Sequence, residues 1–409
     1  MGVYGLLGRR LAHSYSPQIH IALGCPEKDY TLFEKEPEEL DAFLRHPAFD
    51  GINVTIPYKL AVIPYMAELT DAARAIGSVN TIVPRPGGGL LGDNTDFYGL
   101  DETFRVASID PAGKKALVLG DGGVAPTVRA VLRHRGAREI VTVSRRGEEN
   151  FENIARHADA EILVNATPVG MYPENGGSLV DLSQFPRLVG VVDLVYNPAR
   201  TALLLQAEQL GIPNSNGLYM LVAQAKRAEE RFQRRAIADS ENGRITREMD
   251  AEMENIALIG MPGVGKTSCG CALAEKTGRT LVDLDEEIAR EAGCGIPAYF
   301  AAHGEDAFRA LETKVLREWG KKSGLILATG GGVVTRPENY ALLHQNSRIF
   351  LLRRDISGLS SAGRPVSQAK GVEAIARERG PLYLSWADHI IDCVSPEENA
   401  SRVLEVLAQ

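Results

Sequence analysis

Short apolar runs recur along the 409-residue chain and alternate with amphipathic stretches. A run of four or so apolar residues is typical of a strand buried on both faces, whereas apolar positions spaced three and four apart indicate a helix. Their alternation predicts parallel sheets covered by helices. In the first half, strands are expected at 3–7, 52–55, 116–119, 140–143, 162–165 and 191–195. In the second half, they are expected at 256–259, 281–282, 325–328, 349–352 and 389–391.

The composition excludes several classes of protein. Hydrophobic residues make up 44% and charged residues 24%, which excludes a disordered or fibrous chain. The 45 Lys and Arg against 53 Asp and Glu give a net charge of −8, which argues against a nucleic-acid partner. No apolar run approaches the roughly 18 residues of a membrane helix, and the N-terminus lacks a signal-peptide pattern. The odd count of five cysteines is typical of reduced thiols in the cytoplasm. Together, these features predict a cytoplasmic enzyme without membrane or nucleic-acid partners.

A phosphate-binding loop is predicted in the second half. Residues 260–267 fit G-x-x-x-x-G-K-[ST], follow the strand at 256–259 and open a helix, which is the context that this motif requires. Backbone N–H groups of such a loop surround phosphates, the lysine reaches the β- and γ-phosphates, and the hydroxyl ligates Mg²⁺. The motif predicts an ATP·Mg²⁺ site formed by Gly260, Gly263, Val264, Gly265, Lys266, Thr267 and Ser268.

Further motifs follow this loop. Asp283 and Asp285 come at a strand end, where alternation points both carboxylates to the same side. Downstream are Phe308-Arg309, the glycines 330–332, Gly363-Arg364-Pro365 and the run 379–383, which begins with Arg379. Together these motifs closely resemble shikimate kinase, from about residue 256 to 409. One departure is that 357–362, before Arg364, is short and lacks an arginine that many members carry.

The kinase resemblance implies roles for these residues. Asp283 would join Thr267 at Mg²⁺, and Asp285 would bind the shikimate hydroxyl and act as its base. Arg309 and Arg379 would hold the substrate carboxylate, a task that suits bidentate guanidinium groups. Gly331 and Gly332 would contact the substrate ring. Lys266 and the lid residue Arg364 would be catalytic residues that contact the transferred phosphate.

A dinucleotide-binding turn is predicted in the first half. Residues 120–125 fit G-x-G-x-x-A between the strand at 116–119 and a helix. The next strand ends in Ser144, Arg145 and Arg146 rather than in an acidic residue, which suits a 2′-phosphate and therefore NADP. The predicted cofactor contacts are Gly120, Gly122, Gly123, Val124, Ala125, Ser144, Arg145 and Arg146.

Uncharged polar groups accompany one lysine and one aspartate in the first 100 residues. Lys59 and Asp96 suit proton transfer at a carbonyl, and the polar groups suit a polyhydroxylated small molecule. Taken singly, Ser14 or Ser16 has an alternative as a helix cap, and Asp96 as a turn residue. The set as a whole resembles shikimate dehydrogenase over about residues 1–232. Departures are Asp121, where many members have a small neutral residue, and Ser144, where Asn is more usual.

This second resemblance also implies roles. Lys59 and Asp96 would be the catalytic pair. The implied substrate-binding residues are Ser14, Ser16, Asn53, Thr55, Asn80, Tyr196 and Gln224. Gly217 and Met220 would contact the cofactor, and 165–171, 193–198 and 217–220 would line its cleft.

The whole sequence predicts an α/β bifunctional enzyme. Its dehydrogenase part would comprise a substrate-binding domain (1–100, completed by a helix at 217–232) and a Rossmann NADP-binding domain (101–216). A polar linker (233–254), more helical than flexible, would lead to a P-loop kinase domain with a parallel sheet (255–409). The first part would reduce 3-dehydroshikimate to shikimate with NADPH, and the second would phosphorylate shikimate with ATP and Mg²⁺.

Three alternatives stay open at this point. In the first, the kinase part phosphorylates another acceptor, such as a sugar acid. In the second, the kinase part is a non-catalytic ATP-binding regulator of the dehydrogenase. In the third, the first part oxidises quinate or shikimate with NAD. The oligomeric state stays open between monomer and homodimer.

Overall fold

The computed structural model describes residues 2–11, 14–26, 29–355 and 371–408. The chain divides into two compact units, which are described separately. The first unit comprises Met1–Val169, Ser178–Tyr196 and Gln206–Met249. The second comprises Gly170–Gly177, Asn197–Leu205 and Asp250–Gln409. The finer boundaries suggested by the sequence remain a prediction.

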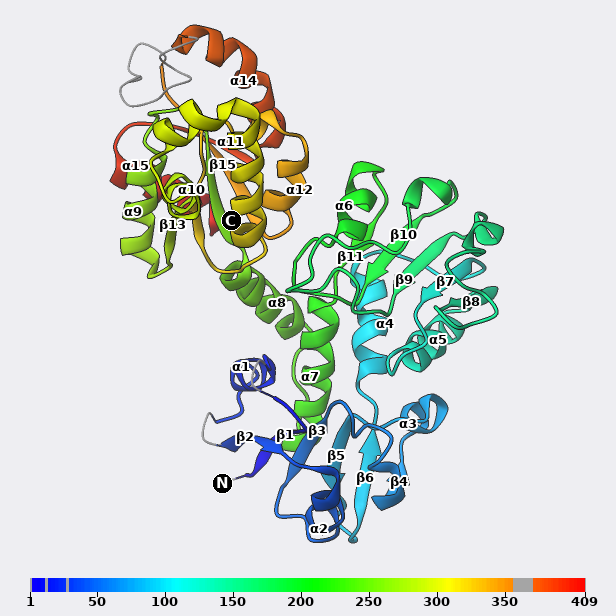
Figure 1. Ribbon diagram of the computed structural model, residues 1–409. Coiled ribbons are helices and arrows are strands. Elements are labelled where there is room, and N and C mark those ends of the chain that lie inside the picture. Colours follow the sequence, from blue (N-terminus) through cyan, green and yellow to red (C-terminus); the bar gives the residue numbers. More distant parts are fainter. Residues whose placement is uncertain (1, 12–13, 27–28, 356–370, 409) are drawn as a thin grey trace. The chain divides into compact units, whose positions relative to one another are not determined.

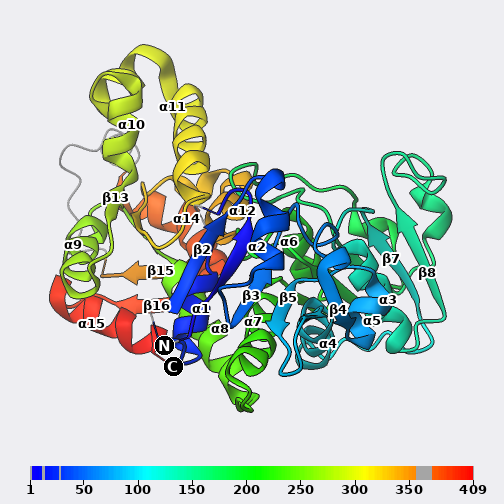
Figure 2. The same ribbon diagram turned by 90° about the horizontal axis from the view of Figure 1, so that it is seen from below.

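A mixed sheet forms the N-terminal part of the first unit (Figure 2). Its strands are β1 (Tyr4–Gly8), β2 (Tyr30–Glu34), β3 (Gly51–Val54), β4 (Met66–Leu69), β5 (Thr81–Pro84) and β6 (Leu90–Asp93), in the order β2-β1-β3-β5-β6-β4. The helices beside them are α1 (Ser16–Ala22), α2 (Leu40–Arg45) and α3 (Asp71–Ile76). Because β5 pairs antiparallel with both β3 and β6, the expectation of parallel sheets alone is wrong for this sheet. A turn through Gly88 and Gly89 joins β5 to β6, and so short a connection can only join antiparallel strands.

A parallel sheet follows in the same unit (Figure 1). Its strands are β7 (Lys115–Leu119), β8 (Glu139–Val143), β9 (Ile162–Asn165), β10 (Gly190–Asp193) and β11 (Asn214–Ser215), in the order β11-β10-β9-β7-β8. The helix α5 (Ala125–His134) belongs to the same unit, and α6 (Ala202–Gln209) falls across the boundary between the two units. The strand order reverses direction at β7, and in open parallel sheets ligands bind at the carboxyl ends beside such a reversal. The predicted turn at 120–125 leaves β7 at that edge.

Two helices bring residues of both sheets together within the first unit. α4 (Asp96–Val106) packs against α7 (Leu218–Gln233), and α7 also contacts α1, β3 and β5. Gly99 allows the close crossing, since a Cβ there would lie 2.6 Å from the carbonyl oxygen of Met220. As a result, Asp96 and Gln224 lie near the mixed sheet although they are far apart in sequence.

The polar segment at 233–254 contains α8 (Ser240–Met253). Its apolar side chains Ile245 and Met249 are buried in a cluster with Ile19, Leu218 and Val222. The two side chains lie one helical turn apart, so a single face of α8 is buried while the charged residues cover the rest. The segment is therefore largely folded, and its role as a linker remains a prediction.

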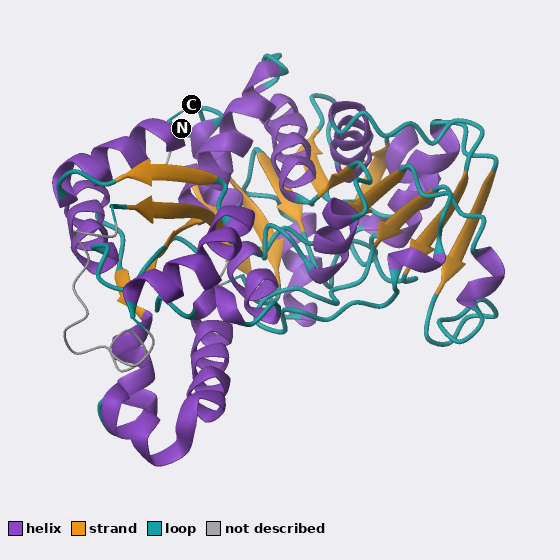
Figure 3. Ribbon diagram, turned by 90° about the horizontal axis from the view of Figure 1, so that it is seen from above, coloured by secondary structure: helices purple, strands orange, loops and turns teal. Residues whose placement is uncertain are grey.

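A second parallel sheet forms the centre of the second unit (Figure 3). Its strands are β12 (Asn255–Ile259), β13 (Leu281–Asp283), β14 (Ile326–Ala328), β15 (Ser347–Arg353) and β16 (His389–Asp392), in the order β13-β14-β12-β15-β16. Its helices are α9 (Lys266–Thr277), α10 (Leu284–Ala292), α11 (Ile296–Gly320), α12 (Glu338–His344), α14 (Val372–Trp386) and α15 (Pro396–Leu407).

The side chains of β12 point alternately to the two faces of this sheet and are buried on both. Ile256 and Leu258 pack against α9 and α15, whereas Ala257 and Ile259 belong to the core that includes α10, α11, α12 and α14. β12 is the central strand, so the loop that follows it emerges in the middle of the carboxyl edge. Among the described residues, no helix is both long enough and apolar enough to cross a membrane.

Candidate active sites

The loop after β12 has the geometry of a phosphate-binding loop. Gly260 has φ +141°, and a Cβ there would lie 2.5 Å from the carbonyl oxygen of Leu352, so only glycine fits. Lys266 begins α9, and its Nζ donates hydrogen bonds to the carbonyl oxygens of Gly260 at 2.9 Å and Met261 at 3.1 Å. The N-terminus of α9 and the ammonium group therefore act on the same space, which favours an anion there.

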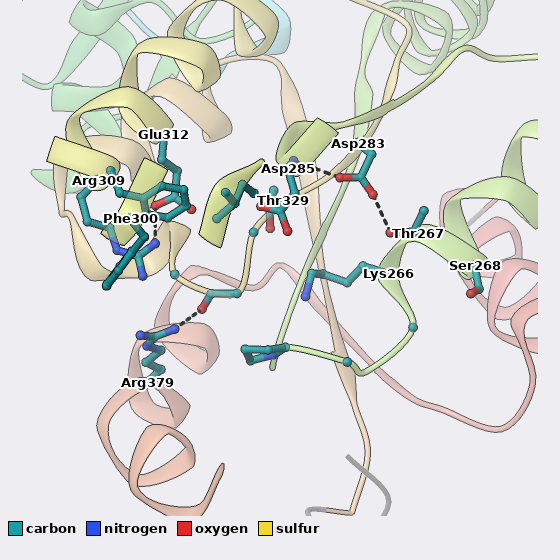
Figure 4. Close-up of a pocket in the computed structure, with 18 residues that line it drawn as sticks. Lys266, Thr267, Ser268, Asp283, Asp285, Phe300, Arg309, Glu312, Thr329 and Arg379 are labelled. Carbon is teal, nitrogen blue, oxygen red and sulfur yellow. Dashed lines mark hydrogen bonds and ion pairs between the residues drawn. The ribbon is translucent and has the colours of Figure 1, made fainter. Parts of the chain in front are cut away.

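Thr267 and Asp283 form a hydrogen-bonded pair of oxygen-bearing side chains next to this loop (Figure 4). The Thr267 hydroxyl donates to Oδ2 of Asp283 at 2.6 Å, and Oδ1 of Asp283 accepts from the backbone N–H of Asp285 at 2.9 Å. Asp283 thus caps α10, while Asp285 lies in its first turn and lines the same pocket. Mg²⁺ is usually held by only one or two protein oxygens together with phosphates and water, so this pair fits the ion.

Two buried arginines lie on the opposite side of this pocket. Arg309, on α11, pairs with Oε2 of Glu312 at 2.8 Å, while its Nε has no partner among the described residues. Arg379, on α14, donates to the carbonyl oxygen of Gly331 at 2.9 Å, and its Nε and second terminal nitrogen lack described partners. Burying unpaired guanidinium nitrogens is costly, so both side chains are poised for an anionic group in the pocket.

Glycine is required beside Arg309. A Cβ on Gly332 would lie 1.9 Å from a terminal nitrogen of Arg309. Burial raises the pKa of the Glu312 carboxyl above its usual value, and the opposing effect of the neighbouring Arg309 is smaller. Burial likewise raises the pKa of Tyr383 to about 12, so its hydroxyl stays protonated and donates to Gly331, as Arg379 does. Two side chains of α14 therefore hold the carbonyl group of Gly331.

These groups enclose a pocket of about 450 Å³, drawn in Figure 4. Of the predicted site residues, it is lined by Gly263, Gly265, Lys266, Thr267, Ser268, Asp283, Asp285, Arg309, Gly331, Gly332 and Arg379. Two predicted loop residues, Gly260 and Val264, are absent from this lining, and the side chain of Val264 is buried in the core. Arg364 and the shortened stretch before it lie outside the described residues.

Phe308 and Gly330, which belong to the motifs noted in the sequence, also line the pocket. The lining further contains residues that the sequence did not single out, namely Pro262, Ile296, Phe300, Glu312 and Thr329. Glu312 had a usable signal, since it lies three residues after Arg309 and therefore on the same helix face. The apolar members carried no such signal, because their pattern is that of ordinary core residues.

Lys59 and Asp96 meet in the first unit. Lys59 lies in the loop after β3 and Asp96 begins α4, and their Nζ and Oδ2 atoms are 2.6 Å apart. The lysine side chain is 26% exposed and the aspartate 11%, so the ammonium reaches solvent while its partner is largely enclosed. This arrangement suits a proton donor whose position is fixed by a carboxylate.

The predicted substrate residues next to this pair are brought together by hydrogen bonds. Asn53, Asn80 and Gln224 belong to one network that runs through Thr81 and Thr95. Ser14 Oγ accepts from the backbone N–H of Ser16, but the N-cap position of α1 is Tyr15 and has no side-chain cap hydrogen bond, so the helix-capping alternative is not supported for Ser14 or Ser16. Thr55 follows β3 and is partly buried.

Tyr196 is connected to the segment around Ser14 and Ser16. Its ring packs edge-on against Tyr15, with the ring centroids 5.9 Å apart. Burial raises the pKa of the Tyr196 hydroxyl, with a smaller contribution from Tyr15. The hydroxyl therefore stays neutral and can act as a hydrogen-bond donor.

The predicted dinucleotide turn lies between β7 and α5. Gly120 to Val124 form the turn, Ala125 begins the helix, and a Cβ at Gly122 or Gly123 would meet open space. Arg145 and Arg146 line a cavity of about 640 Å³ together with Asp121. A helix N-terminus and two arginines form a suitable site for pyrophosphate and a 2′-phosphate, so these residues fit NADP.

Three other predicted cofactor contacts are more enclosed. Ser144 is buried at the end of β8, and the side chain of Met220 is buried in the core with Leu100 and Phe104. Gly217 lies against the backbone, since a Cβ there would be 2.2 Å from the carbonyl oxygen of Leu194. Their assignment to the cofactor remains a prediction.

Comparison with known proteins gives a consistent family assignment. Residues 6–82 match the family "Shikimate dehydrogenase substrate binding domain", and residues 262–408 match the family "Shikimate kinase". A shikimate dehydrogenase (NADP(+)) of Clostridium beijerinckii is 36% identical over 251 residues, covering 57% of this chain and 92% of the relative.

Two solved structures resemble the dehydrogenase part. The shikimate 5-dehydrogenase of Thermus thermophilus in complex with NADP(H) and shikimate has a TM-score of 0.54 at 31% identity, covering 61% of this chain and 99% of that one. The quinate dehydrogenase of Corynebacterium glutamicum in complex with NAD has a TM-score of 0.54 at 28% identity, covering 60% and 97%. From this fold, these sites and these matches, the chain belongs to the shikimate dehydrogenase family and carries a shikimate kinase domain in residues 262–408.

Proposed function

We propose that this chain catalyses two consecutive reactions, the NADPH-dependent reduction of 3-dehydroshikimate to shikimate and the ATP-dependent phosphorylation of shikimate to shikimate 3-phosphate. The relatives of the first part and the family of residues 262–408 each support one half. A cytoplasmic location belongs to the same proposal, and the five unpaired cysteines support it.

The Lys59–Asp96 pair carries the dehydrogenase half. In 3-dehydroshikimate, the carbonyl oxygen at carbon-3 gains negative charge as the carbon is reduced. The Nζ of Lys59 donates a proton to that oxygen, and Asp96, 2.6 Å away, keeps the ammonium oriented. Bound NADPH supplies the hydride to carbon-3. The product is the hydroxyl of shikimate, and Lys59 regains its proton from solvent through its exposed side.

The pocket around Lys266 carries the kinase half. Arg309 and Arg379 bind the shikimate carboxylate with guanidinium nitrogens that have no described partner. This contact turns the ring so that its 3-hydroxyl faces Asp285, whose carboxylate accepts the hydroxyl proton during phosphoryl transfer. Lys266 moves from the carbonyl oxygens of Gly260 and Met261 to the ATP phosphates.

Thr267 and Asp283 hold the metal ion in this scheme. Their oxygen atoms lie next to the loop that cradles the phosphates. Mg²⁺ bound there supplies positive charge to the phosphate oxygens. The N-terminus of α9 adds further positive potential at the same place.

Kinetics on separate substrates test this assignment against its alternatives. We expect turnover of shikimate with NADP⁺ to exceed turnover with NAD⁺, and turnover of shikimate to exceed that of quinate. We also expect ATP consumption only when shikimate is present. Preference for NAD⁺ and quinate would replace the first half of the proposal, and ATP consumption with a different sugar acid would replace the second.

Substituting Gly332 by Ala tests the role of Arg309. The new methyl group would overlap the Arg309 guanidinium, which must then move out of its position. Since a hydrogen bond to a charged group is worth about a factor of ten or more, the KM of the kinase for shikimate is expected to rise at least about tenfold. Initial rates of ADP formation at varied shikimate concentration measure this change.

Gly295→Ala is the matched control for this variant. A Cβ at Gly295, which caps the N-terminus of α11, would meet only the ring of Pro297 at 3.9 Å. This control should keep the wild-type KM for shikimate. If Gly332→Ala also kept it, the placement of Arg309 at the carboxylate would be incorrect.

A further inference from the structure

A buried polar network connects the substrate residues of the dehydrogenase. Its members Asn53, Asn80, Thr81 and Thr95 are at most 5% exposed, and they lie on β3, just before β5, on β5 and in the loop between β6 and α4. The hydroxyl of Thr81 lies at the centre. It is 3.3 Å from Nδ2 of Asn53, 3.0 Å from Oδ1 of Asn80 and 3.2 Å from Oγ1 of Thr95.

The orientation of the Asn80 amide follows from these contacts. A backbone N–H can only donate, and that of Thr95 lies 2.8 Å from Oδ1 of Asn80. The hydroxyls of Thr81 and Thr95 lie 3.0 and 3.2 Å from the same oxygen. Among the described residues, none accepts a hydrogen bond from Nδ2 of Asn80. The network therefore leaves the NH₂ group of Asn80 as the end available to a ligand oxygen.

The Asn53 amide is held at both ends. Its Oδ1 accepts from the hydroxyl of Tyr30 at 3.2 Å, and its Nδ2 donates to Thr81 at 3.3 Å. Burial raises the pKa of Tyr30, so its hydroxyl remains a donor. The side chain of Ser16, another predicted substrate residue, lowers the pKa of the Tyr30 hydroxyl to a smaller extent. Tyr30 and Thr81 therefore fix which edge of the Asn53 amide each neighbour contacts.

We propose that Thr81 is a positioning residue of the dehydrogenase, with Tyr30 as its counterpart at the other end of Asn53. The Thr81 hydroxyl accepts from Asn53 and donates to Asn80, and so orients both amides toward the oxygen atoms of the substrate. It does not touch the reacting atoms. The inference rests on the proposed function, since it assumes that Asn53 and Asn80 contact 3-dehydroshikimate.

Thr81→Val tests this role, because valine keeps the shape of threonine and removes the hydroxyl. Losing one buried hydrogen bond from an orienting group is expected to raise the KM for 3-dehydroshikimate about fivefold. The KM for NADPH, the kinase activity of the same chain and the turnover number should change less than twofold. Thr81→Ser, which restores the hydroxyl, should return the substrate KM to near the wild-type value.

Thr103→Val is the matched control. Thr103 is as buried as Thr81, at 1% exposure, but its hydroxyl donates to the carbonyl oxygen of Gly99 within α4. It should keep the wild-type KM for 3-dehydroshikimate. An equal rise in both valine variants, or a Thr81→Ser variant as impaired as Thr81→Val, would overturn the positioning role, because packing would then explain the effect.

Tyr30→Phe provides a second test that does not depend on the folding of Thr81→Val. It removes the donor to Oδ1 of Asn53, and the substrate KM should again rise about fivefold with an unchanged KM for NADPH. An unchanged substrate KM in both Tyr30→Phe and Thr81→Val would refute the inference alone. If the wild-type chain did not reduce 3-dehydroshikimate at all, the proposed function would fail instead.

Discussion

A chain carrying Lys59→Ala is expected to lose at least about a hundredfold in the turnover number for 3-dehydroshikimate reduction, because a positioned acid contributes that much to proton transfer. The substitution removes the ammonium group that lies 2.6 Å from the carboxylate of Asp96. The phosphorylation of shikimate by the same protein should stay at the wild-type rate. NADPH absorbance and ADP formation, followed in separate assays, measure the two activities.

Lys35→Ala is the matched control for this variant. Lys35 also forms an ion pair with a carboxylate, that of Glu39 at 2.9 Å, but Glu39 is 49% exposed, whereas Asp96 is 11% exposed. Its loss should leave both activities unchanged. Retention of full dehydrogenase turnover by Lys59→Ala would remove Lys59 from the mechanism.

The kinase activity is expected to depend as strongly on Asp285. Asp285→Asn keeps the shape and hydrogen-bonding size of the side chain but cannot accept the hydroxyl proton, so the turnover number for shikimate phosphorylation should fall at least about a hundredfold. Reduction of 3-dehydroshikimate by this variant should match the wild type. The measurement is single-turnover phosphorylation with excess enzyme, which isolates the chemical step.

Glu286→Gln is the appropriate comparison for Asp285→Asn. Glu286 is the next residue of α10, is exposed, and is absent from the pocket lining. The Glu286→Gln substitution removes one negative charge from the same turn of α10, as Asp285→Asn does. A similar fall in both variants would indicate a general electrostatic effect rather than a base at Asp285.

Much of the fold was accessible from the sequence because its buried strands are short apolar runs. All eleven expected strands are present. The strands that the sequence missed are β2, β4, β5, β6 and β11. β2, β4 and β11 are edge strands with short or partly exposed patterns, so their side chains lack the continuous apolar run of a central strand.

The sites were predictable where chemistry fixes the residue type. The phosphate loop, the Lys59–Asp96 pair and the two pocket arginines all occur where motif and resemblance suggested. Thr81, Tyr30 and Glu312 were not assigned a role, because each acts through a neighbour and their significance depends on contacts between distant segments. For Tyr30 and Asn53, 23 residues separate the partners, and only the pairing of β1 with both β2 and β3 brings them together.

The most direct test of the central claim is a coupled reaction with the purified chain as the only enzyme. The mixture contains 3-dehydroshikimate, NADPH, ATP and Mg²⁺, and the oxidation of NADPH is compared with the formation of shikimate 3-phosphate. The account predicts that one phosphorylated product forms for each NADPH oxidised, that Asp285→Asn stops at shikimate, and that Lys59→Ala needs added shikimate. NADPH oxidation without any phosphorylated product, or ATP consumption that ignores shikimate, would contradict it.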